Sequence, residues 1–140
     1  MAEAEASTSR GWFLTVMAVL FVLLAISDFA KPIQFGPPNP AAGIVEFGHK
    51  FHGIVPNLVL GTMFGILFLV YAYGLWNMRA WVLPIAIAYA FYVPYNVALF
   101  NTNHEEAAYS LVFTVVWLAI ALTGSVGTAI YLAYNRQRLR

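Results

Sequence analysis

Hydrophobic residues are gathered in long runs that are separated by short polar segments. A helix that crosses a bilayer needs roughly 20 mostly apolar residues, because each residue rises about 1.5 Å through a hydrocarbon core about 30 Å thick. Four runs approach or exceed this length, and Asp28, at the end of the first, is the only charged residue in them. They predict spans at about 12–28, 55–76, 81–101 and 109–134. We therefore expect an all-α protein, a transmembrane four-helix bundle that forms a single membrane domain over 1–140.

The connection 29–54 is the only join long enough to hold structure of its own. Its second half reads AAGIVEFGHKFHGI. On a helix, at 100° per residue, four apolar side chains form one stripe, namely Ile44, Phe47, Phe51 and Ile54. Polar residues occupy the opposite face, namely Glu46, His49 and Lys50. This pattern predicts an interfacial amphipathic helix before the second span.

The composition changes the picture from a helical protein to a membrane protein. The chain is 61% hydrophobic and 9% charged, whereas soluble domains carry roughly 45–50% and about 25%. This excludes an ordinary soluble fold and makes the lipid bilayer the expected partner. A net charge of +1 gives no sign of a nucleic-acid surface, and the absence of Cys excludes thiolate chemistry.

The basic residues also predict an orientation, because cytoplasmic loops carry an excess of Lys and Arg. With four spans, one side collects five of them, namely Arg10, Arg79, Arg136, Arg138 and Arg140, and the other collects Lys31 and Lys50. We expect a multi-pass protein of the cell inner membrane with both termini in the cytoplasm. The acidic start MAEAEAS argues against a cleaved signal peptide.

Polar residues within the spans are the candidate ligand-binding residues. Tyr89, Tyr92 and Asn96 lie three and four positions apart, on one face of the third span, and Asn57 lies at a similar depth in the second. Polar groups in hydrocarbon seldom point at lipid, so we expect these four to line an outward-facing cavity that a kink at Pro94 would widen. The competing interpretation is that they are packing residues hydrogen-bonded between helices.

A metal site at the outer rim is the second chemical hypothesis. All three histidines are expected on that side, and with one carboxylate they give the candidate ligands His49, His52, His104 and Glu46. The spacing matches no HExxH motif, and Lys50 would repel a cation there. A solvated interfacial face explains the same residues, and the sequence leaves the identity of any cofactor open.

Small residues at helical spacing predict close helix contacts. Gly61 and Gly65 form a GxxxG pair in the second span, and Gly124 and Gly127 lie in the fourth. These faces serve either packing within the bundle or contact with a second copy or a membrane-complex partner. Sequence alone does not separate the two uses.

The stretch YAYGLWNMRAWVLPIAIAYAFYVPYN followed by VALF, Tyr71 to Phe100, resembles a segment of uncharacterised small bacterial four-helix integral membrane proteins. In that group a Gly/Trp/Met-Arg turn precedes a Trp-x-Leu-Pro helix. The resemblance implies a bacterial inner-membrane protein and implies no activity, cofactor or functional residue.

Together these patterns favour a non-enzymatic membrane protein that binds an apolar or lipid-like ligand or serves as a subunit of a larger membrane complex. The alternative is a membrane enzyme or metal-binding protein that acts through the His/Glu residues of the outer rim.

Overall fold

The computed structural model describes residues 11–33, 43–102 and 111–140. The chain is mostly helical, which confirms the all-α expectation for the described part. The helices are α1 (Gly11–Ala30), α2 (Ile54–Trp76), α3 (Val82–Thr102), α4 (Leu111–Leu122) and α5 (Thr128–Tyr134). A π-helical turn, Thr123–Gly127, joins α4 to α5 without a break, and a short 3₁₀ helix follows at Arg136–Arg138.

Three helices, α1, α2 and α3, are long and apolar enough to cross a membrane, and a shorter apolar stretch covers Leu118–Tyr134. The helix bounds agree with the predicted spans to within two residues for the first three. α3 continues through Pro94 as one helix.

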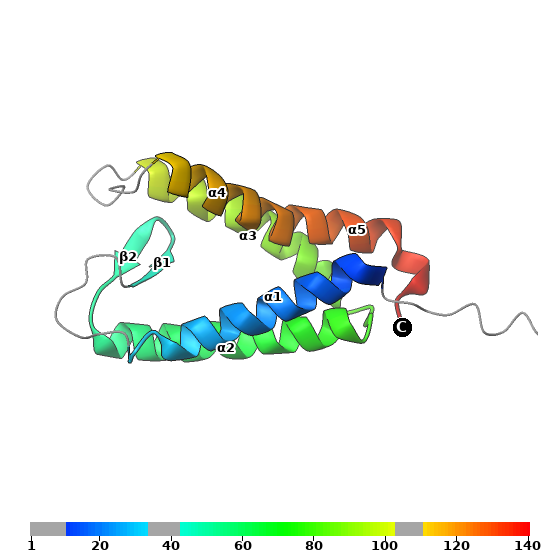
Figure 1. Cartoon of the computed structure of the whole chain (residues 1–140), viewed down its shortest axis with the longest axis horizontal. Helices are drawn as coiled ribbons and strands as arrows, with labels where there is room; N and C mark the ends of the chain where they lie inside the picture. The colour runs from blue at the N-terminus through cyan, green and yellow to red at the C-terminus, as the bar shows by residue number, and fades with distance from the viewer. Residues whose placement is uncertain (1–10, 34–42, 103–110) are drawn as a thin grey trace, which may run out of the picture.

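The helices are arranged as two groups that meet at one end (Figure 1). α1 lies along α2, and α3 lies beside α4 and α5. The groups approach each other at the end where the C-terminus lies and diverge toward the opposite end. We refer to these as the terminal end and the hairpin end.

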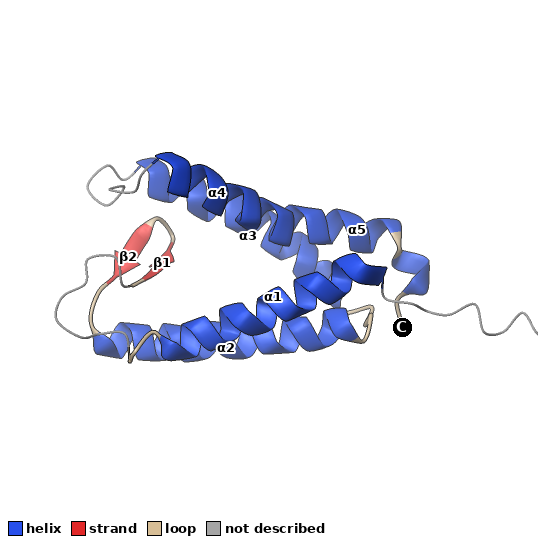
Figure 2. Ribbon diagram, viewed as in Figure 1, coloured by secondary structure: helices blue, strands red, loops and turns tan. Residues whose placement is uncertain are grey.

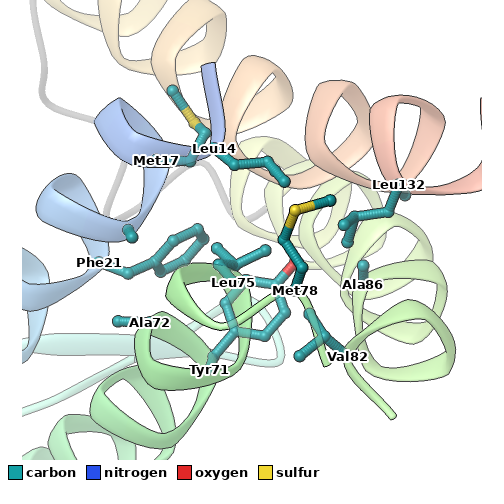
Figure 3. Packing of buried hydrophobic residues seen from close by; sticks show 12 residues of the cluster. Leu14, Met17, Phe21, Tyr71, Ala72, Leu75, Met78, Val82, Ala86 and Leu132 are labelled. Carbon is teal, nitrogen blue, oxygen red and sulfur yellow. The ribbon is translucent and has the colours of Figure 1, made fainter. Parts of the chain in front are cut away.

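A hydrophobic core joins the two groups at the terminal end (Figure 3). Leu14 and Phe21 of α1, Leu75 of α2, and Val82 of α3 are each at most 1% exposed, and Leu132 of α5 is fully buried beside them. Many other apolar side chains of the same helices, such as Leu67 of α2 and Ile130 of α5, are exposed. Each of these four helices therefore buries some of its apolar side chains and leaves others exposed.

The small residues of α2 allow α1 to pack closely against it. A Cβ atom on Gly61 would collide with the backbone oxygen of Asp28, and one on Gly65 would lie 2.7 Å from the Phe29 ring. The Gly61/Gly65 face is thus occupied within the chain.

The turn between α2 and α3 is fixed by backbone hydrogen bonds. Met78 is buried with φ 50°, and the Arg79 amide donates to the Gly74 oxygen at 3.0 Å, which closes the end of α2. The backbone of Arg140 exchanges hydrogen bonds with Met78 and Ala80, so the last residues are tied to this turn.

The segment before α2 is a β-hairpin (Figure 2), and the predicted interfacial amphipathic helix is wrong. Strands β1 (Ile44–Glu46) and β2 (His49–Phe51) pair antiparallel. Phe47 and Gly48 form the two-residue turn with φ 51° and 77°, the positive values of a type I′ hairpin turn. Glycine is a poor helix former, and Gly48 lies where the turn requires a left-handed backbone conformation. In the hairpin, Glu46 lies opposite His49 and Val45 lies opposite Lys50.

Candidate functional site

Asn57, one of the predicted ligand-binding residues, anchors the hairpin to α2. Its side chain is fully buried, and its Oδ1 accepts a hydrogen bond from the Ile44 amide at 2.9 Å. Its Nδ2 donates to the carbonyl oxygens of Phe51 at 2.7 Å and Gly53 at 2.9 Å. The amide therefore holds both strands of the hairpin and the residue that precedes α2.

Asn96 holds the same hairpin from α3. Its Nδ2 donates to the Val45 oxygen at 3.1 Å, and its Oδ1 accepts from the Gly48 amide at 3.0 Å. A Cβ atom on Gly48 would lie 2.8 Å from Cβ of Leu99, so the turn also packs directly on α3. Two asparagines on different helices thus hold one hairpin, which lies between the diverging helices in Figure 1.

Tyr89 belongs to an aromatic cluster below the hairpin. Its ring lies 5.9 Å from Phe21, 6.1 Å from Phe68 and 6.2 Å from Tyr71, measured between centroids. Aromatic residues from α1, α2 and α3 therefore meet at one level. The carboxyl groups of Glu46 and Asp28 both lie within electrostatic range of the Tyr89 side chain.

Tyr92 lies one helical turn before Asn96, beside the hairpin turn. Its ring meets Phe47 edge-on, with 6.0 Å between the ring centroids. Its hydroxyl is buried and has no hydrogen-bond partner among the residues that the structure describes, and the same holds for Oε2 of Glu46. A buried polar atom without a partner costs roughly 1–3 kcal/mol. The hydroxyls of Tyr71 and Thr128 are in the same position among the described residues, but they belong to helices α2 and α5 and not to the hairpin and α3.

Burial, and to a smaller extent the nearby Asp28 carboxylate, raises the pKa of Glu46 to about 7. A carboxyl group with such a pKa is partly protonated near neutrality, and in that form it donates a hydrogen bond. Glu46 in this form and the Tyr92 phenol are each able to donate a hydrogen bond.

The four predicted metal ligands are only partly brought together. Glu46 and His49 lie directly opposite each other in the hairpin, whereas His52 is exposed beyond β2. His104 lies outside the described residues. Within the described ranges no group of three His, Asp or Glu side chains is placed to hold a metal ion.

Other features lie away from these residues. A shallow hollow of about 370 Å³ at the terminal end is lined by Phe13, Ile130, Tyr131 and Tyr134 with Gly127 and Asn135, and contains none of the predicted ligand residues.

The predicted small-residue face of the fourth span is only partly covered. A Cβ atom on Gly124 would meet nothing within 4 Å, whereas one on Gly127 would touch Phe13. A partner on the Gly124 face remains a prediction.

Sequence reasoning did not identify Asp28, Phe47 or Tyr71 as part of this region. From the sequence, Asp28 only marks the end of the first predicted span, and Phe47 belongs to the predicted helical stripe. The missed signal was local: Phe47-Gly48 flanked by β-branched residues on one side is a possible hairpin turn. Tyr71 is only 4% exposed, and its buried hydroxyl has no partner among the described residues.

Comparison of the chain with family models, curated proteins and solved structures finds no match. The interpretation of the site therefore depends on its own residues.

Proposed function

We propose that this chain is a non-enzymatic integral membrane protein that binds a lipid-like ligand between its two helix groups, under the hairpin. The observation that carries the proposal is the pair of buried, unpartnered oxygen atoms, Glu46 Oε2 and Tyr92 Oη. They come from the hairpin and from α3, and they lie where the helix groups diverge.

The proposed orientation follows from the basic residues. Arg79, Arg136, Arg138 and Arg140 lie at the terminal end, which we place in the cytoplasm of a bacterial cell, with the hairpin outside. The apolar exteriors of α1, α2 and α3 support insertion in the membrane.

The chemistry of the unpartnered atoms suggests the ligand class. A phenol and a protonated carboxyl group both donate hydrogen bonds, so the best match is an uncharged head with acceptor oxygens, such as an ester or hydroxyl. The rings of Phe68 and Tyr89, which are only partly buried, offer an apolar surface for the attached chain.

Three probes with an 18-carbon chain test this assignment: monoolein with an uncharged head, oleate with an anionic head and oleylamine with a cationic head. A ligand at 100 times its Kd stabilises the folded state by about 2.7 kcal/mol. We expect monoolein to raise the Tm of protein in a mild detergent and the other two to raise it less.

Tyr92→Phe removes one donor and should abolish most of the monoolein effect. Tyr95→Phe is the matched control, because Tyr95 lies on the same helix but is 58% exposed. Equal monoolein effects in the two variants would contradict the proposed site.

A further inference from the structure

We propose that the terminal end binds an anionic phospholipid of the surrounding bilayer, with an acyl chain in the hollow beside Phe13 and the phosphate at the arginines that follow α5. The hollow and these arginines lie at the opposite end of the molecule from the hairpin. The inference goes beyond the proposed function and shares with it only the placement in a membrane.

The hollow runs along the last two turns of the apolar stretch Leu118–Tyr134. The exposed side chains of Ile130 and Tyr134 line it from α5, and the ring of Phe13 lines it from α1. Gly127 leaves this space open, because a Cβ atom there would already lie 3.8 Å from the Phe13 ring. From Gly127 to Tyr134 the helix rises about 10 Å, so one segment of an acyl chain could cover these apolar side chains.

Two exposed arginines, Arg136 and Arg138, follow the hollow directly. Asn135 lines the hollow and ends α5, where its Nδ2 donates to the Tyr131 oxygen at 2.9 Å. The short 3₁₀ helix begins at the next residue. A lipid whose chain lies along α5 would therefore have its head group at the level of these two arginines.

A third exposed arginine, Arg79, is brought to the same end by the turn between α2 and α3. The Arg140 amide donates to the Met78 oxygen at 2.9 Å, and the Arg140 oxygen accepts from the Ala80 amide at 2.7 Å. These two bonds flank Arg79 and fix the backbone that follows the 3₁₀ helix. Basic residues on a fixed backbone lose less conformational freedom on binding than those of a flexible tail.

The charge at this end favours an anionic partner. Within residues 11–33, 43–102 and 111–140 the acidic side chains are Asp28 and Glu46, and both lie at the hairpin end. A guanidinium group binds phosphate oxygens through paired hydrogen bonds. An anionic phospholipid offers a phosphate and an apolar chain in one molecule, whereas a zwitterionic head adds a cation that the arginines would repel.

Phosphatidylglycerol and phosphatidylcholine with the same palmitoyl and oleoyl chains test the proposal, because they differ only in the head group. Native mass spectrometry of the delipidated full chain in a mild detergent gives a Kd for the first lipid bound. One basic residue near an anionic membrane surface contributes about fivefold to binding, so we expect phosphatidylglycerol to bind at least about tenfold more tightly. Equal Kd values, or displacement by inorganic phosphate at the same concentration as the lipid, would overturn the proposal.

The head-group contact is tested by Arg136→Gln combined with Arg138→Gln. Both side chains are exposed, so the variant should keep the wild-type Tm while its Kd for phosphatidylglycerol rises about tenfold. Lys31→Gln, which removes a positive charge at the hairpin end, is the control and should leave this Kd unchanged. An unchanged Kd in the arginine variant would contradict the site.

The chain contact is tested by Gly127→Leu, which should fill the hollow and weaken the binding of both lipids. Gly124→Leu is the matched control, because a Cβ atom on Gly124 meets nothing within 4 Å and Gly124 does not line the hollow. Equal losses in these two variants would refute the hollow as the chain site. Tyr92→Phe should bind phosphatidylglycerol as the wild type does, and a loss there would move the lipid to the hairpin end and overturn the proposal.

Discussion

The terminal end and the hairpin end of this molecule are stabilised by different interactions. At the terminal end, apolar side chains from α1, α2, α3 and α5 pack around Leu75, and the Tyr71 hydroxyl lies among them without a partner in the described part of the chain. At the hairpin end, the two helix groups are bridged by the side-chain amides of Asn57 and Asn96. Apolar packing therefore dominates the contact at one end, whereas side-chain hydrogen bonds dominate it at the other.

The largest expected effect on stability comes from a substitution in the hydrophobic core of the terminal end. Leu75→Ala, at a position that is fully buried, should reduce the free energy of unfolding by about 3 kcal/mol, because it removes packing atoms and leaves a cavity. Chemical unfolding in mixed micelles measures the change. Leu67→Ala on the same helix is the control, since Leu67 is 52% exposed and should have little effect. Similar losses in both would mean that the terminal end is not the core.

The next effect should be confined to the hairpin end. Asn57→Leu leaves the Ile44 amide and the Phe51 and Gly53 oxygens without their partner, which we expect to destabilise the hairpin locally by about 2 kcal/mol. Exchange of the Ile44 amide should accelerate, while the helices unfold at nearly the wild-type denaturant concentration. Asn77→Leu is the control, because Asn77 is exposed and bonds only within its own turn. An unchanged Ile44 exchange rate would refute the anchor.

A smaller effect, a gain in stability, is expected from removing the buried hydroxyl of Tyr71. Tyr71→Phe removes a buried hydroxyl that has no partner among the described residues, so it should stabilise the fold by about 1 kcal/mol. Tyr73→Phe, at a position 57% exposed on the same helix, should be neutral. A loss of stability in Tyr71→Phe, measured by the same unfolding experiment, would show that the hydroxyl has a partner in the folded protein.

The smallest effect concerns metal. The lipid-ligand account predicts that elemental analysis of protein purified without chelator finds less than about one Zn, Cu, Fe or Mn per several chains. A stoichiometric metal that is lost in His49→Ala would instead favour the predicted His/Glu site. His49 lies opposite Glu46 in the hairpin, so that variant tests the pair that the fold does bring together.

The sequence predicts the terminal end far better than the hairpin end. Long apolar runs bounded by Asp28 and by Asn77–Ala80 locate α1, α2 and α3, because helix length in lipid depends on local composition. The hairpin was predicted as a helix, since Ile44, Phe47 and Phe51 also fit a helical stripe. The hairpin also depends on hydrogen bonds with Asn96, which lies 48 and 51 residues away in the chain from Gly48 and Val45, so no local pattern reveals them.

The candidate site shows the same division. The prediction that Asn57 and Asn96 lie near one end of their helices used only their positions in the spans. In the structure these asparagines bind the hairpin backbone, and Glu46 pairs with His49 across it. Both arrangements depend on the turn at Phe47 and Gly48, which the spacing of apolar residues does not reveal. The lipid-like ligand itself stays a prediction.

Native mass spectrometry of the gently purified protein tests the central claim most directly. The account predicts that the wild type and Tyr95→Phe retain a lipid-like molecule with an uncharged oxygen-bearing head, and that Tyr92→Phe loses it. A wild-type mass without any such bound molecule would contradict the proposed ligand. A Tyr92→Phe variant that retains the molecule as well as the wild type would contradict the proposed site.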